Sequence, residues 1–423
     1  MNKPIYLSDM ACICALGNNL DEIRHNLINH STQKMIESDK WLIGNNKTLV
    51  GKVNQNTSTK MQLPSIDFPE HNSRNNQLLL AALMQIQKSV NAAIAQYGPD
   101  RIAIIIGTST SGIDEGDAAI KQYLINKTLP NNYYYQQQEL GDPALFLAKY
   151  LKTTGPAYSI STACSSSVRA IISGQRMILS GMVDVAIVGG VDTLCRLAIN
   201  GFNSLASLSS KPCTPFAIDR DGINISEGAG LILLSKQAFQ FYIKPNIINP
   251  IVLLGIGESS DAYHISAPHP QGDGAARAMK MALEQAQLEP AQIGYINLHG
   301  TATMLNDQAE TIAVQSIFGD LPSGEDVPCS STKHLTGHAL GAAGIVEAAI
   351  CALILSEKLD LPIQDFSQSA QDKTLAKIKF ATKKTQPKKA TILSNSFAFG
   401  GNNACFILGT QKWIDGKIEN AIK

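Results

Sequence analysis

Short runs rich in apolar residues recur along the chain and predict β-strands that are buried on both faces. They lie at 101–106, 184–190, 231–234, 251–254, 293–298, 327–331 and 391–394. Such runs are typical of sheets whose two faces are covered by helices, whereas a half-exposed strand alternates apolar and polar residues. The pattern therefore favours an α/β protein with a mostly parallel sheet.

Helical periodicity separates these runs. The clearest pattern spans 75–96, a small-residue apolar helix is expected at 165–179, and an amphipathic helix that Asn19 can cap ends at Leu27. Strands that alternate with helices at this spacing indicate consecutive βαβ units.

The alternation of strands and helices starts a second time after a break marked by Pro245 and Pro250. The stretches 161–172 and 337–349 both run from a strand through small residues into an apolar helix, although few of their residues are identical. We therefore predict two similar halves, at 1–245 and 246–423. Each half presents a helix start to the middle of the molecule, and ligands of open α/β sheets bind beyond the carboxyl ends of the strands.

The charge balance argues against a surface built for nucleic acid, because 35 Lys and Arg oppose 35 Asp and Glu among the 423 residues. An acidic residue interrupts the N-terminal apolar residues before any secretory signal forms. The longest apolar helix expected, 345–355, contains Glu347 and is shorter than the ~20 residues of a membrane span. We expect a cytoplasmic protein with no membrane span, whose eight cysteines are reduced thiols.

Three reactive side chains follow predicted strands. Cys164 opens the helix at 165–179, and His299 and His338 come after the runs at 293–298 and 327–331. A helix N-terminus carries unpaired N–H groups and about half a positive charge, so we expect it to favour a thiolate at Cys164. A single cysteine in an apolar setting is more often a small core residue. Two histidines at equivalent strand ends make a reactive Cys–His–His group the better interpretation.

Several motifs occur together along the chain. They are 162–167 (Thr-Ala-Cys-Ser-Ser-Ser), 219–222 (Asp-Arg-Asp-Gly) with 227–230 (Glu-Gly-Ala-Gly), 261–264 (Asp-Ala-Tyr-His), 299–301 (His-Gly-Thr) with Asp307, Lys333 with 337–338 (Gly-His), and 395–402 (Asn-Ser-Phe-Ala-Phe-Gly-Gly-Asn). With these motifs, in this order, the chain resembles the elongating β-ketoacyl-acyl-carrier-protein synthases of the thiolase-like superfamily, over nearly its whole length. The resemblance implies a layered αβαβα sandwich built from two similar βαβαβ-type halves.

The resemblance also implies an acyltransferase reaction, a decarboxylative Claisen condensation in two stages. Cys164 would take an acyl chain from a carrier-protein thioester, and malonyl-carrier protein would lose carbon dioxide to give an enolate that attacks the acyl-cysteine. The product is a 3-oxoacyl-carrier protein, as in fatty acid, polyketide or aryl polyene elongation. His299 and His338 would stabilise the enolate as neutral hydrogen-bond donors.

Supporting roles follow from the same resemblance. An oxyanion would lie between the N–H groups of Cys164 and Phe399, where Gly400 and Gly401 let the backbone approach closely. Lys333 and Glu347 would form a charged pair that orients the site. The remaining candidates are Phe399 and Phe202 as gates, Thr301 and Thr303 as support on the substrate side, and Thr110, Tyr133 and Tyr135 in the acyl pocket. For Phe202, ordinary core packing stays an open alternative.

No cofactor or metal is expected, because the family's substrates arrive on the phosphopantetheine arm of an acyl carrier protein. Family members pair through the N-terminal half, so we expect a homodimer or a heterodimer with a ketosynthase-like paralogue. Ala398 stands where many relatives have glycine, which favours a specialised pathway. Two alternatives are a non-catalytic subunit that sets chain length, which would lack the cysteine, and a thiolase, which needs a second reactive cysteine where only Cys405 lies nearby.

Overall fold

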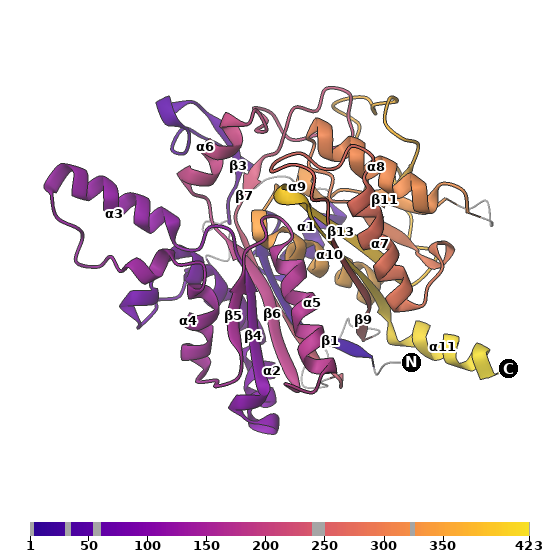
Figure 1. The fold of residues 1–423 in the computed structure, drawn as a ribbon, viewed down its shortest axis with the longest axis horizontal. Coiled ribbons are helices and arrows are strands. Elements are labelled where there is room, and N and C mark those ends of the chain that lie inside the picture. Colours follow the sequence, from indigo (N-terminus) through magenta and orange to yellow (C-terminus); the bar gives the residue numbers. More distant parts are fainter. Residues whose placement is uncertain (1–3, 30–34, 54–60, 239–249, 322–325, 423) are drawn as a thin grey trace.

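The dominant element of the protein is an 11-stranded sheet with the order β12-β11-β10-β13-β14-β9-β1-β8-β6-β4-β5 (Figure 1). The computed structural model describes residues 4–29, 35–53, 61–238, 250–321 and 326–422. The strands of the sheet are β1 (Ile5–Cys14), β4 (Ile102–Gly107), β5 (Ala157–Ile160), β6 (Val185–Asp192), β8 (Gly228–Ser235), β9 (Ile251–Ser260), β10 (Tyr295–Asn297), β11 (Pro328–Ser330), β12 (Lys379–Phe380), β13 (Thr391–Ala398) and β14 (Asn402–Thr410). A second sheet has the strands β2 (Met35–Ser38), β3 (Thr48–Gly51) and β7 (Ile225–Ser226).

The two halves of the large sheet repeat one topology. When the short edge strand β12 is left out and the strands of each half are counted in chain order, both halves have the spatial order third, second, fourth, fifth, first. This order is β5-β4-β6-β8-β1 in the N-terminal half and β11-β10-β13-β14-β9 in the C-terminal half. In each half the second strand pairs in parallel with the third and fourth, and the fifth strand is antiparallel to both of its neighbours. The sheet is therefore mixed, and the prediction of a mostly parallel sheet is wrong, because apolar runs do not show strand direction. An antiparallel pair between residues 5–7 and 251–253 joins the halves. The expected division at residue 245 falls within 239–249, outside the described residues, and stays a prediction.

Helices cover both faces of each half-sheet. α2 (Arg74–Tyr97) and α4 (Asp142–Leu151) lie on the outer face of the N-terminal half, and α7 (Asp273–Ala286) and α8 (Met304–Phe318) on that of the C-terminal half (Figure 1). α5 (Ser166–Leu179) and α10 (Ala343–Glu357) fill the space between the two half-sheets. The other helices are α1 (Leu20–Ile28), α3 (Ile113–Asn126), α6 (Arg196–Ser204), α9 (Lys333–Thr336) and α11 (Gln411–Ile422). The layers therefore follow the order αβαβα, as expected for a thiolase-like fold.

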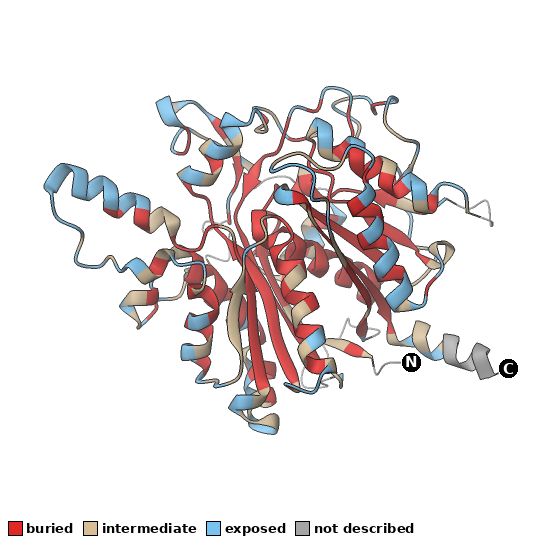
Figure 2. Cartoon of the chain, viewed as in Figure 1, coloured by how far each residue is buried: buried red, intermediate tan, exposed pale blue. Residues whose placement is uncertain are grey.

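The alternation of side chains along each strand creates separate apolar cores between the layers. In β4, Ile102, Ile104 and Ile106 pack with the outer helices, whereas Ala103 and Ile105 pack with α5 and α10. Both sets are fully buried, and Figure 2 shows most strands buried, with the edge strand β5 of intermediate exposure and α5 buried along one side. Burial on both faces explains why these strands read as continuous apolar runs.

Most elements predicted from the sequence are confirmed. All seven apolar runs contain a strand, and the Asn19 side chain caps α1 by accepting a hydrogen bond of 2.9 Å from the N–H of Glu22. The sequence did not predict α6, which lies in a stretch interpreted as loop; the helix is short, and only Ile199 in it is buried. It also did not predict β14, whose apolar run around Cys405 was interpreted only as core.

The central apolar helix is longer than the predicted 345–355. With the turn Leu340–Ala342 before α10 it spans Leu340–Glu357, and this helix and Arg74–Tyr97 are each long and apolar enough to cross a membrane. The 18-residue window in Leu340–Glu357 is 94% buried inside the protein, however, and core helices commonly pass the same test. The two helices are therefore weak evidence for a membrane span.

We expect Gly107→Ala to destabilise the fold. A Cβ atom at Gly107 would come within 2.4 Å of the backbone nitrogen of Ser167, so β4 and α5 would have to move apart, and overpacking of this kind typically costs about 1–3 kcal/mol. Gly141→Ala is the matched control, because a Cβ atom there would meet nothing within 4 Å. Urea unfolding measures both variants, and equal stabilities would show that the contact between β4 and α5 is not tight.

Candidate active site

Cys164 lies on a sharp turn between β5 and α5. Ala163, just before it, has a left-handed backbone with φ of 50°, which is unfavourable for a residue with a Cβ atom. Ser166 stabilises the turn, because its hydroxyl donates to the carbonyl of Ala163 at 2.6 Å and accepts from the N–H of Thr162 at 2.9 Å. The turn places the sulfur at the N-terminal end of the buried helix α5.

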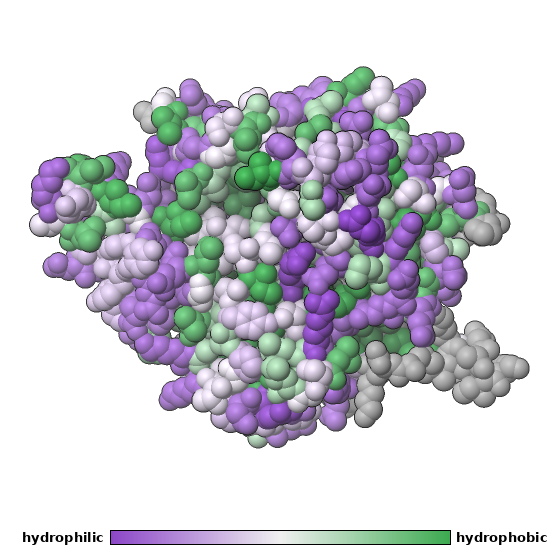
Figure 3. Space-filling model, in the orientation of Figure 1, coloured by the Kyte–Doolittle hydropathy of each residue, from purple (hydrophilic) through white to green (hydrophobic). Residues whose placement is uncertain are grey.

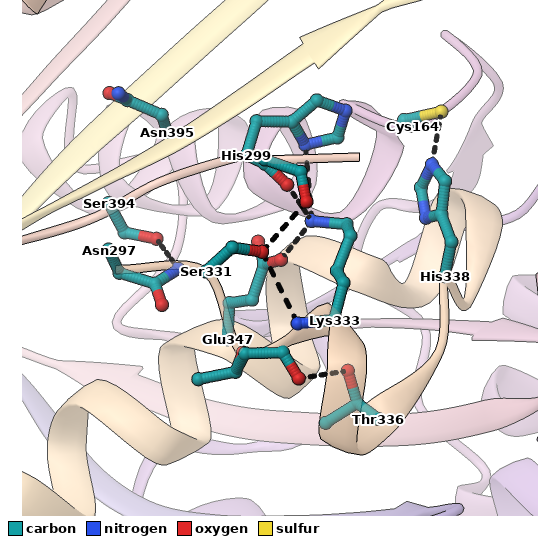
Figure 4. Close-up of polar contacts among 12 residues, drawn as sticks. Cys164, Asn297, His299, Ser331, Lys333, Thr336, His338, Glu347, Ser394 and Asn395 are labelled. Atoms are coloured by element: carbon teal, nitrogen blue, oxygen red, sulfur yellow. Dashed lines mark hydrogen bonds and ion pairs between the residues drawn. The ribbon is translucent and has the colours of Figure 1, made fainter. Parts of the chain in front are cut away.

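Two histidines from the C-terminal half reach the same place. His299 follows β10, and His338 lies in the turn between α9 and α10. The Nε2 atom of His338 lies 3.0 Å from the Cys164 sulfur, and one ligand atom from each of the three side chains lies within 4.8 Å of the others (Figure 4). The structure therefore brings together the cysteine and both histidines that the sequence singled out.

Lys333 and Glu347 stand behind the histidines as a buried ion pair (Figure 4). The Nζ atom of Lys333 contacts the Glu347 carboxylate, donates to the carbonyl of His299 at 2.5 Å and lies 3.4 Å from its Nδ1 atom. Because a lysine ammonium can only donate, this contact favours the His299 tautomer whose proton is on Nε2. The predicted charged pair is present and orients His299.

The protonation states of the site agree only in part with expectation. Burial, and secondly the charge of Lys333, hold the pKa of His299 and of His338 well below the usual range, so both imidazoles are neutral, as predicted. Burial also raises the pKa of Cys164 to about 12, although Lys333 opposes the rise. The expected resting thiolate is therefore wrong: the cost of burying the charge exceeds the helix-end effect, and Cys164 rests as a thiol beside a neutral His338.

The sequence analysis missed Glu310, which holds the turn that carries His299. Its carboxylate accepts hydrogen bonds of 2.7 Å from the N–H groups of both His299 and Gly300, and one of 3.1 Å from the Asn395 amide. Burial raises the pKa of Glu310 to about 7. Its place on the buried face of α8, shortly after the His-Gly-Thr motif, was the available signal.

A cavity of about 230 Å³ opens onto the reactive group. Among its lining residues are Cys164, His299, His338, Phe399, Phe202, Thr301 and Thr303. The rings of Phe202 and Phe399 are 5.3 Å apart between centroids, and the hydroxyls of Thr301 and Thr303 are 2.9 Å apart. The gate pair and the two threonines predicted from the resemblance therefore share one cavity. Phe202 also packs against a small apolar core, so its role as a gate stays a prediction.

The glycines after Phe399 have the expected freedom. Gly400 and Gly401 have φ of 80° and 70°, a region that glycine adopts without strain. The carbonyl of Gly401 accepts a hydrogen bond of 2.8 Å from the N–H of Asp261, which ties this loop to the cavity rim. The role of the Cys164 and Phe399 N–H groups as an oxyanion site stays a prediction.

The three candidates for the acyl pocket do not line this cavity. Thr110 is buried, but its hydroxyl donates to the carboxylate of Asp192 at 2.8 Å. Tyr135 is 67% exposed and Tyr133 is half-buried, in and near a surface turn. Within this single chain the tyrosines therefore do not shape the cavity.

Cysteine and histidine at this spacing are also suitable ligands for a transition metal. Cys164, His299 and His338 together offer three such atoms. The nearby ammonium of Lys333, 3.4 Å from His299 Nδ1, opposes binding of a cation. The expectation that the site works without a metal stays a prediction.

The fold and the buried Cys–His–His group define an acyltransferase of the thiolase-like class. Residues 2–239 match the description "Beta-ketoacyl synthase, N-terminal domain" and residues 251–366 match "Beta-ketoacyl synthase, C-terminal domain". The chain therefore belongs to the β-ketoacyl synthase family, and it is an enzyme of the 3-oxoacyl-[acyl-carrier-protein] synthase type.

Curated relatives and solved structures agree with this membership. The 3-oxoacyl-[acyl-carrier-protein] synthase 2 of Rhizobium meliloti is 38% identical over 265 residues, which are 61% of this chain and 61% of that protein. Its namesake from Staphylococcus aureus is 31% identical over 342 residues, covering 79% of this chain and 83% of that protein. A chain in the structure of the ketosynthase ApeO in complex with its chain length factor ApeC, from Xenorhabdus doucetiae, is 51% identical with a TM-score of 0.89, covering 96% of this chain and 98% of that one.

We expect Lys333→Met to destabilise the protein and to change the reactivity of Cys164. Glu347 would be left buried without its partner, which typically costs roughly 3–5 kcal/mol. Loss of the positive charge also raises the pKa of Cys164 further, so alkylation of Cys164 by iodoacetamide should require a higher pH. Urea unfolding and mass spectrometry of the Cys164 peptide measure the two effects.

The double variant Lys333→Met/Glu347→Gln is the matched control. It removes both charges of the pair, so it should recover most of the lost stability and part of the shift in alkylation pH, since Glu347 itself raises the pKa of Cys164. A double variant no more stable than Lys333→Met would contradict a coupled ion pair.

Proposed function

We propose that this chain is the catalytic ketosynthase subunit that extends an acyl chain on an acyl carrier protein by decarboxylative condensation with malonyl-carrier protein. The observation that carries the proposal is the 3.0 Å contact between the Cys164 sulfur and His338 Nε2, with His299 beside it in one cavity. A non-catalytic chain-length subunit would not need this nucleophile. A thiolase would need a second reactive cysteine, and Cys405 is instead buried in the core.

In the first stage the sulfur of Cys164 forms a bond to the acyl carbonyl carbon of the carrier thioester. Because burial raises the pKa of the thiol to about 12, its proton leaves only during the attack, and Nε2 of His338 is the hydrogen-bonded acceptor. The bond to the phosphopantetheine sulfur then breaks, and that sulfur leaves with the proton. The N–H groups of Cys164 and Phe399 would stabilise the intermediate oxyanion.

In the second stage malonyl thioester loses carbon dioxide, and the electrons of the broken bond form an enolate. His299 would donate from Nε2 to the enolate oxygen, because its Nδ1 faces Lys333. The enolate carbon bonds to the acyl carbonyl carbon, the bond to Cys164 breaks, and a proton from solvent restores the thiol. His338 can serve in both stages, since its Nδ1 has no hydrogen-bond partner among the described residues and its proton can lie on either nitrogen.

We further propose that the enzyme serves a specialised pathway, with an aryl polyene as the candidate product. The support is the similarity, 51% over 96% of this chain, to a structure in which a ketosynthase is bound to its own chain length factor. Condensation assays with saturated and conjugated acyl-carrier proteins, read by mass spectrometry, test the substrate. All eight cysteines are buried thiols, which is consistent with a cytoplasmic site of action.

The partner would be a second ketosynthase-like chain, either a copy or a paralogue. α3 projects from the body of the protein in Figure 1, and Figure 3 shows apolar surface on this projection. Ile120, Leu124 and Ile125 are 55%, 64% and 72% exposed on this helix. Apolar surface of this kind marks interaction sites, and it lies in the half through which family members pair.

We expect Cys164→Ala and His299→Ala to fail at different stages. Cys164→Ala removes the acyl acceptor, so no acyl-enzyme should form. His299→Ala should still form it but should condense ~10²–10³-fold more slowly, the usual effect of removing one donor to a developing oxyanion. Intact-protein mass spectrometry follows acylation, and product analysis follows condensation. Normal condensation by Cys164→Ala would refute the proposed nucleophile.

The charged double variant Leu124→Glu/Ile125→Glu should abolish association of the chain with its partner, because burying two carboxylates in an apolar interface is costly. Met84→Glu is the control, since Met84 is likewise exposed, at 58%, but lies on α2. Light scattering after size exclusion, with the chain alone and co-expressed with a candidate paralogue, gives the mass of each species. An unchanged dimer in the double variant would exclude α3 from the interface.

A further inference from the structure

Asp192, the last residue of β6, is a fully buried carboxylate that gathers hydrogen bonds from both halves of the protein. Its Oδ1 atom accepts from the N–H groups of Ser109 and Thr110 at 2.8 Å each and from the hydroxyls of Thr108 and Thr110 at 2.9 and 2.8 Å. Its Oδ2 atom accepts from the N–H of Gly341 at 2.5 Å. Gly341 lies in the turn that runs from His338 to the start of α10.

The repeat of the fold makes Gly341 the counterpart of Cys164. Ala163 and Leu340 both have left-handed backbones, with φ of 50° and 49°, and each precedes by three residues the start of its helix, α5 or α10. Cys164 and Gly341 are the next residues in the two turns. Both helix starts therefore direct an N–H group of equivalent position towards the middle of the molecule.

The strand ends follow the same repeat. Asp192 ends β6 and pairs with the first residue of β8, and Ala398 ends β13 and pairs with the first residue of β14. Asp192 reaches the helix start of the other half, at Gly341. Phe399, which follows Ala398, lines the cavity at Cys164, again the helix start of the other half. The start of α10 is thus occupied by the carboxylate of Asp192, and the start of α5 opens onto the cavity.

We propose that Asp192 is a positioning residue. Its carboxylate occupies, at the start of α10, the place that the reaction oxyanion takes at the start of α5. In this way it holds the turn after His338 so that His338 stays in contact with Cys164. The inference rests on the proposed function for its kinetic consequence. With five donors on the carboxylate, Asp192 connects the loop after β4, the end of β6 and the turn after His338. Loss of this connection would let His338 move from its 3.0 Å contact with the sulfur.

The negative charge of Asp192 also acts on the nucleophile. It raises the pKa of Cys164, as does Glu347, whereas Lys333 lowers it. Replacing the carboxylate by a neutral amide should therefore make the thiol more acidic, since the charges of Lys333 and Glu347 stay in place. A residue that only stabilised the fold would have no such effect on Cys164.

The test compares Asp192→Asn with the wild type and with Asp142→Asn. Asp142 is also fully buried and hydrogen-bonded, through His71 at 2.6 Å and Asn76 at 2.6 Å, but it lies in α4 and does not line the cavity. For each variant we would measure stability by urea unfolding, the pH profile of Cys164 alkylation, the rate of acyl-enzyme formation and the rate of condensation.

We expect Asp192→Asn to alkylate at lower pH than the wild type. Acyl-enzyme formation and condensation, which both use His338, should each be slower by up to ~10²-fold, the loss that a misplacement of about 1 Å in a reacting group can cause. Asp142→Asn should lose stability but keep the wild-type alkylation profile and rates per folded molecule. An Asp192→Asn variant that matches Asp142→Asn in both respects would overturn the proposal.

Thr110→Val provides a second variant if Asp192→Asn does not fold. It removes one hydroxyl donor from the carboxylate and keeps the charge, so condensation should fall without a change in the alkylation profile. Unchanged condensation in Thr110→Val would count against the positioning role. The alkylation measurement needs no carrier protein, so it tests Asp192 even if the wild type proves unable to condense, an outcome that would refute the proposed function alone.

Discussion

The first turn of α5 is tightly packed at Ser167, and the active site depends on that constraint. Gly107, Gly190 and Gly344 surround Ser167, and a Cβ atom on any of them would meet an atom of Ser167 within 3.1 Å. The Ser167 hydroxyl in turn accepts a hydrogen bond of 3.0 Å from the N–H of Ile345. Three glycines from two strands and the opposing helix thus fix the helix that carries the nucleophile, and tight interiors of this kind transmit small displacements.

Burial sets the chemistry of the site as strongly as its geometry does. The interior around Cys164 keeps the thiol protonated and both imidazoles neutral, so the three reacting side chains carry no charge at rest, and the Lys333–Glu347 pair lies behind His299. Neutral donors suit an enolate, because they stabilise its developing charge without first being neutralised by a counter-ion. The same burial lowers the fraction of Cys164 that is present as the nucleophilic thiolate, so the sulfur must lose its proton within the reaction step.

The sequence predicted what depends on local pattern and on motifs. The strands, the central helices, the Cys–His–His group and the Lys333–Glu347 pair all appear in the structure as expected. It did not predict the protonation of Cys164, because the depth of burial is a property of the whole fold. Asp192 and Glu310 were missed because their partners lie on other elements, and Thr110 was assigned to the acyl pocket because a loop hydroxyl carries no sign of the carboxylate it contacts.

The repeated topology also determines how many reaction centres one chain can support. A structure made of two equivalent units offers two helix starts of the same shape, and two open helix starts would allow two competing centres. Here the carboxylate of Asp192 occupies the helix start at α10. The two halves thus share a backbone topology but differ in their side chains. The C-terminal half, whose helix start is occupied, supplies His299 and His338 to the site at Cys164 in the N-terminal half.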